Sequence, residues 1–345
     1  MRLNDTSVWQ DGSGPDSDVV VSSRVRLARN LAGVPFVNAA SAAQRHEVIR
    51  MVQHARWPGE VAPNLVWVNL QQATPLDRTL LVERHLISKQ FADGDLPRSV
   101  AITHDESLSV MVNEEDHLRM QVLKSGMRLS ECFERVETLD VSLERSLDFA
   151  FLPRWGYLTA CPTNVGCGIR FSVMLHLPGL KLTNELEKVR RAAKDMHLAV
   201  RGFYGEGSEA IGDFFQVSNQ ITLGRSESDL FDHFANCIVP NLVEYERTAR
   251  AVLINQSRMM VDDRVHRALA TLRAARLLSA DEAMKLLSRV RLGVCLGRLS
   301  DVDLATVHRL FLQTQPAHLK VLTSPDEPDP ELRETRATLV RRSLS

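Results

Sequence analysis

The feature of this sequence that most constrains its fold is a change of pattern near residue 245. Before that point, short runs with the alternation of strands are mixed with stretches of helical periodicity. After it, only helical patterns follow. Mixed strands followed by consecutive helices are typical of two separate units. The sequence therefore predicts an antiparallel α+β domain at residues 10–245 and an all-helical domain at residues 246–345.

Alternation, periodicity and capping residues predict the individual elements. The expected strands are Val19–Val21, Leu65–Leu70, Ser99–Thr103, Leu108–Val112, Trp155–Thr159, Ile169–Leu177, His197–Arg201 and Phe215–Thr222. The expected helices of the first domain are 41–56, 77–92, 115–135, 184–196 with a capping box of Asn184 and Glu187, and Leu230–Ile238. The second domain is expected to hold a helix over 242–278, helices capped by Ser279 with Glu282 and by Ser300 with Asp303, and a basic last helix.

Charge and composition exclude several classes of protein. The 42 Lys and Arg residues nearly balance the 43 Asp and Glu residues, so no overall field favours nucleic acid or a membrane surface. The five cysteines are odd in number and lack C-x-x-C spacing, which argues against a disulfide framework or a structural zinc site. Met1–Gln10 lacks the apolar core of a signal peptide, and no apolar run reaches the length of a membrane span. These features predict a cytoplasmic protein.

Arginine is far more frequent than lysine in this chain. Seven of the 42 basic residues are lysine, which leaves 35 arginines. A genome rich in arginine codons explains such a bias, and so does a need for guanidinium forks that clamp phosphate. Known phosphate-binding sequences do not decide between them. The chain contains neither G-x-x-x-x-G-K-[ST] nor the glycine-rich loop and H-R-D of protein kinases.

Five short segments combine residue types that suit a polar site. They are Ser22–Arg26 after a strand, Asn113–Arg119 with three consecutive acids, Cys161–Gly166 with Pro, Asn and Gly, Arg170 at the start of a strand, and the glycine-rich Arg201–Gly207. Each also has an ordinary structural explanation: solvated arginines at a strand end, acids at a helix N-terminus, a buried inert thiol, or a surface turn. Considered singly, none of them decides between structure and function.

Taken in order, these segments resemble the phosphagen kinases, and most closely their bacterial protein-arginine kinase branch. The resemblance rests on SSRVRLARN (22–30), HLIS (85–88), NEEDHLR (113–119), GYLTACPTNVG (156–166), RGFYGEGSE (201–209) and QVSNQITLG (216–224). It covers nearly the whole chain. It implies an α+β catalytic fold with a mainly antiparallel sheet flanked by helices, a smaller helical C-terminal domain, and an ATP-dependent kinase that phosphorylates guanidinium nitrogens.

The resemblance also implies which residues bind ATP. Five arginines would clamp the phosphates: Arg24, Arg26, Arg119, Arg170 and Arg201. The nucleotide would also contact Ser22, Ser23, Val25, His85, Phe171, Ser172, Val173, Met174, Gly202, Phe203, Tyr204 and Gly205. Five neighbouring guanidinium groups repel one another, so a polyphosphate is what makes such a cluster tolerable. The family uses ATP with Mg²⁺, and the metal is expected on phosphates and water rather than directly on the protein.

On the acceptor side, a guanidinium with a pKa of about 12.5–13.8 is a poor nucleophile. Carboxylates can hold it, align one nitrogen and take its proton as transfer proceeds. By resemblance, Glu115 is the expected base and Glu206 the expected clamp, while Glu114 shares in substrate binding. Cys161 matches the reactive cysteine of the family. Its thiolate would orient the guanidinium without acting as a nucleophile.

The chain departs from the family pattern in two places. Cys167 stands where the CPTN-x-G segment usually continues with Thr, which is either a simple small-residue exchange or a second thiol that permits oxidative inhibition. The protein-arginine kinase branch carries R-D-x-x-R-A near its C-terminus, in a regulatory pocket for phosphoarginine. Here the segment reads LRETRA over 332–337, so the pocket would depend on Arg333, Glu334 and Arg336.

Three functions are compatible with these residues. The first is a protein-arginine kinase that marks proteins for regulated proteolysis or inactivates a stress-response repressor. The second is a kinase for free arginine or another small guanidino compound, and the third is a silent adaptor that binds phosphoarginine proteins. The first implies protein substrates with exposed arginines, an activator protein, a transcriptional repressor and a Clp-type protease as partners. It also implies a homodimer that contacts neither membrane nor nucleic acid.

Overall fold

The computed structural model describes residue 7, residue 9 and residues 11–202, 211–324 and 329–345. Its described strands are β1 (Val20–Arg29), β2 (Leu65–Asn69), β3 (Ser99–Thr103), β4 (Leu108–Val112), β5 (Leu118–Ser125), β6 (Phe151–Leu152), β7 (Gly156–Tyr157), β8 (Ile169–His176), β9 (Leu198–Arg201) and β10 (Phe214–Asn219). Its described α-helices are α1 (Ala42–Gln53), α2 (Pro75–Glu83), α3 (Lys89–Ala92), α4 (Leu129–Glu144), α5 (Pro178–Leu182), α6 (Leu186–Asp195), α7 (Glu227–His233), α8 (Val239–Ala274), α9 (Ala280–Cys295), α10 (Leu304–Gln313), α11 (Pro316–Leu322) and α12 (Asp329–Ser343).

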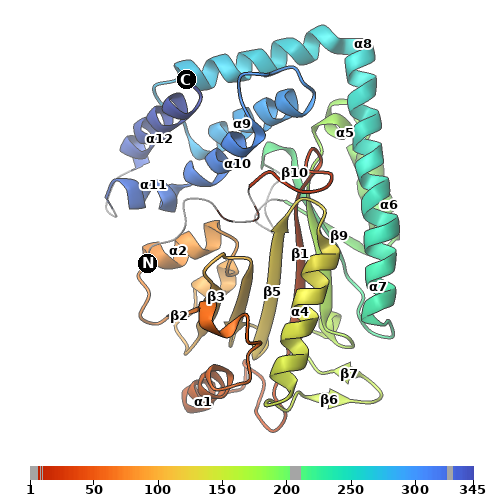
Figure 1. The fold of residues 1–345 in the computed structure, drawn as a ribbon, viewed down its shortest axis with the longest axis vertical. Coiled ribbons are helices and arrows are strands. Elements are labelled where there is room, and N and C mark those ends of the chain that lie inside the picture. The colour runs from red at the N-terminus through yellow and green to blue at the C-terminus, as the bar shows by residue number, and fades with distance from the viewer. Residues whose placement is uncertain (1–6, 8, 10, 203–210, 325–328) are drawn as a thin grey trace.

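A large antiparallel sheet forms the centre of the first part of the chain. In the described residues it has eight strands in the order β2-β3-β4-β5-β1-β8-β10-β9, and every neighbouring pair is antiparallel. The long strand β1 therefore lies in the interior of the sheet, between β5 and β8 (Figure 1). This arrangement confirms the expected α+β class with a mainly antiparallel sheet.

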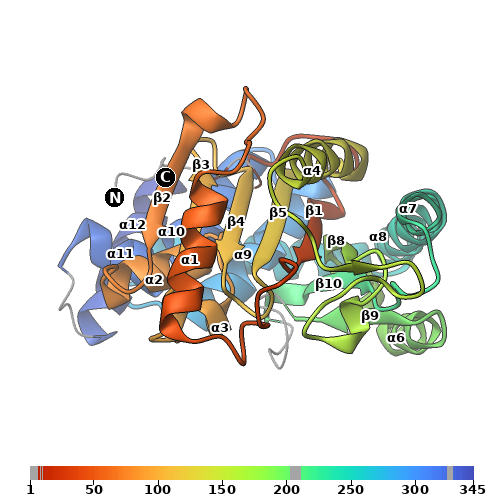
Figure 2. The ribbon, with the colours of Figure 1, turned by 90° about the horizontal axis from the view of Figure 1, so that it is seen from below.

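Two cores cover opposite faces of β1. Val25 and Leu27 point toward α4 and belong to a core that also contains Val136 and Leu139 of that helix. Helix α4 runs along β1 and β5, and Figure 2 shows it on that face of the sheet. The second core joins Met174 of β8 to the C-terminal helices. Because alternate residues of a strand point to opposite faces, Arg24 and Arg26 lie on the face away from α4.

Helix α8 connects the sheet to the C-terminal helices. It begins at Val239, passes residue 245 without interruption, and bends sharply at Ser257, whose φ of −143° and ψ of 34° are not helical (Figure 1). After the bend, α9 and α12 pack against it. Helix α9 starts at Ser279, whose side chain accepts a hydrogen bond from the Glu282 backbone N–H, as the sequence predicts.

The C-terminal helices contact the first part of the chain through buried polar groups. Arg291 of α9 is bonded through Nη1 to Nδ1 of His176 on β8 at 2.8 Å and donates through Nε to Nε2 of His308 on α10 at 2.9 Å. At a second contact, the Glu83 carboxylate accepts from the backbone N–H groups of Ala317 and His318, at 2.9 and 3.2 Å. Glu83 thus caps α11 from α2 and ties the two regions together.

The expected helix over 115–135 is wrong. Residues 114–117 form a tight turn, β5 follows over Leu118–Ser125, and α4 begins only at Leu129. Strand β5 lies between β4 and β1 and is buried on both faces, so the apolar and polar residues do not alternate cleanly in its sequence. The buried run was therefore mistaken for the start of the helix behind it.

Three further helix expectations need correction. The expected helix 77–92 is interrupted, because His85 takes a φ of 57° and separates α2 from α3. The predicted capping box of Asn184 and Glu187 is absent, because Asn184 has a φ of 60° and α6 starts after Glu185 without a side-chain cap. Asp303 is itself the N-cap of α10, where Ser300 was expected.

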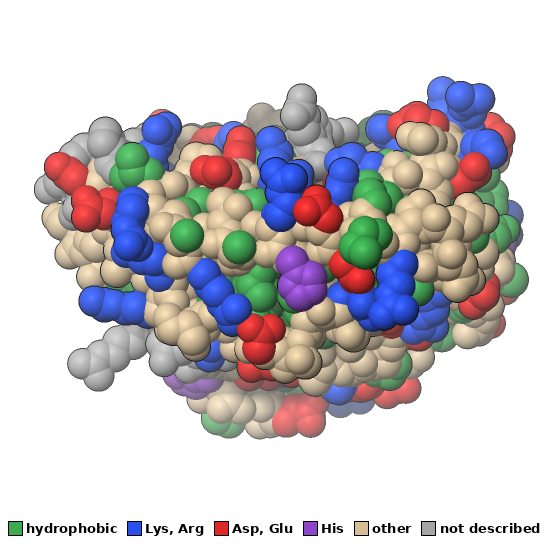
Figure 3. All heavy atoms as spheres, turned by 90° about the horizontal axis from the view of Figure 1, so that it is seen from above, with side chains coloured by type: hydrophobic (Ala, Val, Ile, Leu, Met, Phe, Trp, Pro, Cys, Tyr) green, Lys and Arg blue, Asp and Glu red, His purple; other side chains and the backbone are tan. Residues whose placement is uncertain are grey.

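The surface above the second half of α8 carries both signs of charge. Figure 3 shows Lys and Arg side chains interspersed with Asp and Glu over this face. Several are paired, such as Arg298 with Asp262 at 2.6 Å and Arg267 with Asp263 at 3.5 Å.

In the part of the chain that the structure describes, no helix combines the length and the apolar character needed to cross a bilayer.

Candidate active site

The central strands bring the five predicted phosphate-binding arginines together, and we call them the arginine cluster. Arg26 of β1 stands directly opposite Arg170 of β8, and Arg24 points the same way two residues earlier. Arg119 enters from β5 and Arg201 from the end of β9. All four neighbours lie close enough to Arg26 to lower its pKa by repulsion. Strands that are far apart in sequence therefore converge on one concentration of positive charge.

Burial and mutual repulsion make the arginine cluster costly. Burial, followed by repulsion from Arg119, Arg170 and Arg201, lowers the pKa of Arg24 to about 9. The same two causes lower the pKa of Arg26 well below its usual range, and they also lower the pKa of Arg170. Guanidinium groups in proteins remain protonated, so we interpret these shifts as the energetic cost of holding the charges together. An anion placed among the groups would remove that cost.

The hydrogen bonds of the arginine cluster are incomplete. Arg24 donates from Nη2 to Oε1 of Gln216 at 2.6 Å and from Nε to Oγ of Ser172 at 3.3 Å. Nε and Nη2 of Arg26 are buried and have no hydrogen-bond partner among the described residues, and Nε of Arg170 is in the same condition. Buried donors in native proteins are rarely left in this state. A ligand with several acceptor oxygens is therefore expected here.

Several residues of the predicted ATP-binding set have side chains on the other face of the sheet. Val25, Phe171 and Val173 belong to the core beneath α4. Ser23 donates its hydroxyl to the carbonyl of Gly126 at 2.8 Å and accepts from the backbone N–H of Arg128 at 3.0 Å. These side chains hold β1 and β8 in place, while the alternate residues of the same strands face the arginine cluster.

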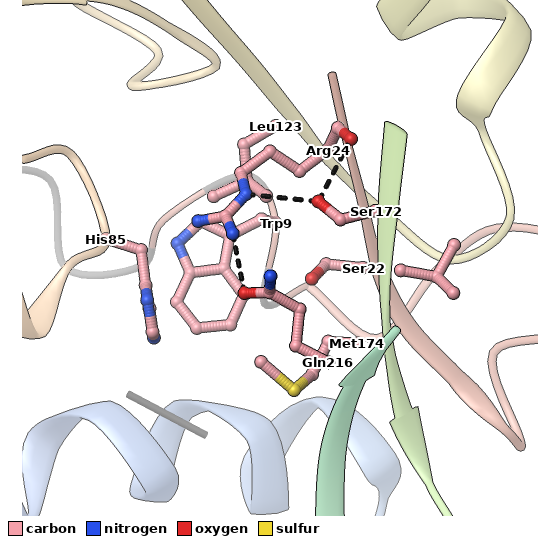
Figure 4. Close-up of a pocket in the computed structure, with 9 residues that line it drawn as sticks. Trp9, Ser22, Arg24, His85, Leu123, Ser172, Met174 and Gln216 are labelled. Carbon is pink, nitrogen blue, oxygen red and sulfur yellow. Dashed lines mark hydrogen bonds between the residues drawn. The ribbon is translucent and has the colours of Figure 1, made fainter. Parts of the chain in front are cut away.

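A narrow pocket adjoins the arginine cluster at Arg24. Ser22, Ser172 and Met174 line it together with His85 and Trp9 (Figure 4). The rings of Trp9 and His85 meet edge to face with centroids 4.9 Å apart. Burial and the charge of Arg24 lower the pKa of His85 to about 3, so its imidazole is neutral at physiological pH. Trp9 is absent from the sequence-based set, since a lone tryptophan near a chain end gives no pattern.

The acidic turn between β4 and β5 supplies a carboxylate that orients Arg119. Oε2 of Glu114 accepts from Nη1 of Arg119 at 2.6 Å, and Oε1 accepts from the hydroxyl of Ser88 at 2.6 Å. Burial tends to raise the pKa of Glu114, but Arg119 and Ser88 outweigh it and the pKa is lowered. Both carboxylate oxygens are occupied. Glu114 therefore positions Arg119, and its part in substrate binding stays a prediction.

Glu115 lies beside Glu114 but in a different electrostatic setting. Burial and the neighbouring carboxylates of Asp116 and Glu114 raise its pKa, against the opposing effects of Arg119 and of a hydrogen bond with Cys161. A carboxylate with a raised pKa is a better proton acceptor. Its contact with Cys161 joins the acidic turn and the cysteine loop at one point.

Asp116 holds these two segments together, a role that sequence reasoning missed. Its Oδ1 accepts from Nδ2 of Asn30 at 2.6 Å and from the backbone N–H of Ala160 at 2.7 Å. Ala160, which precedes Cys161, is therefore held against Asp116, which follows Glu115. Both Asp116 and Asn30 lie within the motifs quoted for the family. The motifs therefore pointed to these two positions, but not to the bridging role of Asp116.

The cysteine loop reaches the arginine cluster through Asn164. Sγ of Cys161 lies 3.1 Å from the hydroxyl of Thr163, and Oδ1 of Asn164 accepts from Nη2 of Arg170 at 3.3 Å. Cys167 behaves differently: its thiol donates to the carbonyl of Thr222 at 3.6 Å, and burial raises its pKa. These properties favour the simple exchange over an oxidation-sensitive thiol at Cys167.

Some predicted residues cannot be placed or lie elsewhere. Phe203, Tyr204, Gly205 and Glu206 lie outside the described residues, so the expected second carboxylate stays a prediction. Gly202, directly after β9, is buried.

The predicted phosphoarginine pocket lies on the last helix, α12. Arg336 is buried and donates from Nε to the carbonyl of Thr314 and from Nη1 to that of Leu278. Arg333 and Glu334 are exposed. The pocket itself stays a prediction.

The expectation that magnesium binds here through phosphate and water, and not directly on the protein, stays a prediction. In the described ranges, no group of three or more His, Cys, Asp or Glu side chains is arranged to hold a metal. Both oxygens of Glu114 and one oxygen of Asp116 already accept hydrogen bonds. The arginine cluster, by contrast, suits a polyanion with many oxygen acceptors.

Comparison with protein families gives two matches that together cover most of the chain. The family described as ATP:guanido phosphotransferase, C-terminal catalytic domain, matches residues 50–249. The family described as the protein-arginine kinase McsB C-terminal domain matches residues 258–345. The first match contains Glu115, Cys161 and three arginines of the cluster, and the second contains most of the helical region.

Individual relatives and structures agree with these matches. The chain is 44% identical to the protein-arginine kinase of Moorella thermoacetica, across 100% of this chain and 99% of that relative. It is 43% identical to the protein-arginine kinase of Brevibacillus brevis, across 99% and 96%. The duplicated taurocyamine kinase of Schistosoma mansoni superposes with a TM-score of 0.62 at 26% identity, across 72% of this chain and 36% of that one. A lombricine kinase shares the fold with a TM-score of 0.60 at 24% identity, across 70% and 69%. The chain therefore belongs to the protein-arginine kinase branch of the ATP:guanido phosphotransferases, and it is an ATP-dependent guanidino kinase.

Proposed function

We propose that this protein transfers the γ-phosphoryl group of ATP to a guanidinium nitrogen of arginine residues in proteins. One observation carries the proposal. Buried donors of Arg26 that lack partners among the described residues face a cluster of repelling arginines, next to the Glu115–Cys161 contact. A polyanion would satisfy the donors of Arg26 and the other arginines. A cation would suit the carboxylate of Glu115. Both reactants of a guanidino kinase thus find complementary charge at adjoining positions.

At the phosphate end, we assign Arg24, Arg26, Arg119, Arg170 and Arg201 to the triphosphate. Phosphoryl transfer has a loose transition state whose charge is spread over oxygens, so positioned cations supply most of the catalysis. Arg119 is held in place by Glu114 at 2.6 Å, and Arg24 by Gln216 at 2.6 Å. Mg²⁺ would be bound through the phosphates and water, where it neutralises charge on the leaving group.

At the acceptor end, we assign Glu115 as the base. Its carboxylate accepts the proton of the attacking nitrogen, and its raised pKa favours that transfer. Cys161 contacts Glu115, and we assign its sulfur to orienting the incoming guanidinium. Glu206 is proposed as the second carboxylate that clamps the acceptor, with the division of roles between the two acids as in the family pattern.

The reaction conserves atoms and charge through these groups. The attacking nitrogen forms a bond to the γ-phosphorus as the bond from that phosphorus to the β,γ-bridging oxygen breaks. The bridging oxygen leaves on ADP with the electron pair, and the nitrogen loses one proton to Glu115. The arginine cluster stabilises the charge on the transferring and leaving oxygens throughout.

Protein substrates, rather than free arginine, are supported by the relatives. Those quoted above are both named protein-arginine kinases and match the chain almost from end to end. We extend the proposal to a cytoplasmic homodimer that works with an activator protein. Its products would serve regulated proteolysis by a Clp-type protease or inactivate a transcriptional repressor. Residues 10–245 would form the catalytic domain and 246–345 the domain for dimer contacts and phosphoarginine regulation.

The test is the fate of γ-labelled phosphate from Mg-ATP, with an arginine-rich protein and free arginine supplied in separate reactions. Acid-labile label on arginine side chains of the protein is the expected result. The Glu115→Ala variant should lose it, whereas Glu134→Gln, which changes an exposed acid on α4, should keep it. Label on free arginine alone would reassign the protein to the small-guanidino kinases. Binding of ATP without transfer to either acceptor, even with cell extract as a source of activator, would refute the kinase function.

A further inference from the structure

The connection between α2 and α3 joins the C-terminal helices to the active site. Helix α11 lies against α2 (Figure 1 and Figure 2), and α2 ends at Glu83, two residues before His85. Glu83 faces α11, whereas His85 lines the pocket beside Arg24. Neighbouring residues of one short connection therefore contact both parts of the molecule.

Glu83 is the N-terminal cap of α11, although it belongs to another helix. The N-cap residue of α11 itself, Gln315, makes no capping bond with its side chain. The buried carboxylate of Glu83 accepts instead from the backbone N–H of Ala317 through Oε1, at 2.9 Å, and from that of His318 through Oε2, at 3.2 Å. The imidazole Nδ1 of His318 lies 2.8 Å from the same Oε2. Because both oxygens are engaged, the end of α2 is fixed relative to α11.

The backbone takes an uncommon conformation where the connection turns toward the site. His85 has a φ of 57°, in the left-handed region that residues with a Cβ rarely occupy. Nε2 of Gln121 on β5 donates to the carbonyl of His85 at 2.7 Å, and the hydroxyl of Ser109 on β4 donates to the carbonyl of Leu86 at 2.9 Å. Such a conformation persists only where surrounding contacts enforce it, and it is typical of functionally constrained positions.

The connection then reaches the acidic turn between β4 and β5. Ser88 donates its hydroxyl to Oε1 of Glu114 at 2.6 Å, and Oε2 of Glu114 accepts from Nη1 of Arg119 at 2.6 Å. The placement of Arg119 thus depends on Glu114, and that of Glu114 depends on Ser88. A continuous set of contacts therefore leads from α11 to one arginine of the cluster.

We propose that Glu83 is a positioning residue for phosphoryl transfer: by capping α11, it fixes the α2–α3 connection and thereby Glu114 and Arg119. The inference rests on the proposed function, because it assigns Arg119 to the triphosphate. A displacement of about 1 Å in a catalytic site can lower the rate about 10²-fold, even when the changed residue is remote. The C-terminal helices then contribute to catalysis without touching the reactants.

The experiment compares two variants that each remove a helix cap. Glu83→Ala removes the cap of α11, and Asp303→Ala removes that of α10, where Oδ1 of Asp303 accepts from the Thr306 backbone N–H at 2.6 Å. The kcat and the KM for ATP are measured with an arginine-rich protein acceptor, below the melting temperature of each variant. Both variants should melt at a lower temperature. Only Glu83→Ala should lower kcat, by about tenfold to a hundredfold, with a smaller change in KM. Glu83→Gln, which keeps one acceptor oxygen, should recover part of the rate.

A double-mutant cycle tests the route through Ser88. Ser88→Ala removes the bond to Glu114, so the cap of α11 no longer acts on Arg119. In the Ser88→Ala background, Glu83→Ala should therefore lower kcat by less than about twofold. Hydrogen exchange supplies a readout that needs no activity. The backbone amides of residues 113–119 should exchange faster in Glu83→Ala than in Asp303→Ala, because the acidic turn is less firmly held.

The inference is overturned if Glu83→Ala keeps the wild-type kcat, or if its loss multiplies with that of Ser88→Ala. Unchanged exchange at residues 113–119 would also overturn it. An equal loss of kcat in Asp303→Ala would reduce the effect to general destabilisation, which overturns it as well. A wild-type protein that transfers no phosphoryl group would instead refute the proposed kinase function, and hydrogen exchange would still decide whether Glu83 positions the acidic turn.

Discussion

Arg26 and Arg29 lie on the same strand, three residues apart. Each has a buried Nε without a hydrogen-bond partner among the described residues, but the groups that surround the two side chains differ. Arg29 is 1% exposed and has acceptors on several sides: its Nη2 meets Asp140 at 2.6 Å and its Nη1 donates to the carbonyl of Cys167 at 2.9 Å. Its guanidinium also lies 3.4 Å from the ring centre of Tyr157. Arg26 has two buried nitrogens without a partner among the described residues, and its neighbours are other arginines.

The same contrast holds between the arginine cluster and the buried contact to the C-terminal helices. Arg291 is fully buried, and burial lowers its pKa to about 10. However, each of its three nitrogens has an acceptor, among them the carbonyls of Ser17 and Asp18 and the ring nitrogens of His176 and His308. Arg291 is thus surrounded by its acceptors. Arg26 has two buried nitrogens without an acceptor among the described residues, which is the arrangement expected where the acceptor is a ligand.

The largest expected effect is a loss of activity when Arg26, whose hydrogen bonds are incomplete, is replaced. Arg26→Ala should lower kcat/KM for ATP by about 10²–10³-fold, the usual loss when one positioned transition-state donor is removed. The melting temperature should stay the same or rise, because the variant removes a repelling charge from the cluster. Steady-state kinetics and thermal unfolding measure the two effects. A fall in melting temperature with activity retained would reverse our assignment of this arginine.

The fully bonded arginine should show the opposite response. Arg291→Met leaves several buried acceptors unsatisfied, and each such group costs roughly 1–3 kcal/mol. The melting temperature should therefore fall by several degrees, while the folded protein keeps its affinity for ATP. Thermal unfolding and calorimetry below the transition would measure this. A loss of ATP affinity without a loss of stability would show that Arg291 belongs functionally to the site.

The carboxylates of the acidic turn extend the comparison to pH. Activity requires an ionised Glu115, whose pKa lies above the usual 4.5, so kcat/KM should fall as the pH drops through that raised pKa. Glu114 has a lowered pKa and stays ionised over this range. For folding the sign is reversed: the raised pKa of Glu115 stabilises the protein at low pH and this contribution is lost as pH rises. His85, with a pKa of about 3, should add no step near pH 6.5.

A profile measured with Glu115→Gln provides the control for this prediction. The variant should have low activity and no acid limb of its own. An acid limb that persists unchanged in Glu115→Gln would assign the titrating group elsewhere.

The smallest effect is expected at the second cysteine. Cys167 already has an acceptor in the carbonyl of Thr222, and a threonine hydroxyl can make the same bond. Cys167→Thr should therefore change kcat/KM by less than about twofold, as expected of an exchange that keeps size and hydrogen bond. Kinetics before and after mild oxidation would detect a redox role. Resistance to oxidation gained only by Cys167→Thr would support the oxidative inhibition that the structure does not favour.

The residues in quoted motifs on strands were expected in one site, and the structure brings their strands together. The alternation of β1 placed Arg24 and Arg26 on one side, and the hairpin of β3 and β4 led correctly to the acidic turn. Side-chain orientation was harder to predict, because membership of a motif does not tell which face a residue occupies. Val25 and Phe171 therefore belong to the core although they lie within the predicted ATP-binding set.

The errors have identifiable physical causes. Strand β5 is buried on both faces, and no clean alternation marks such a strand against a following helix. Trp9 and Arg84 are brought to the site by contacts between residues 75 positions apart. Asp116 acts by bridging Asn30 and Ala160, which is a property of three segments and not of one motif. Long-range contacts of this kind leave no local pattern in a sequence.

The central claim is that the arginine cluster awaits a polyphosphate, and calorimetric titration with Mg-tripolyphosphate tests it most directly. The account predicts one bound equivalent that ATP displaces, that Arg26→Ala weakens strongly, and that Arg291→Met leaves unchanged in the folded protein. No binding, or binding that ATP does not displace and that Arg26→Ala leaves intact, would contradict it.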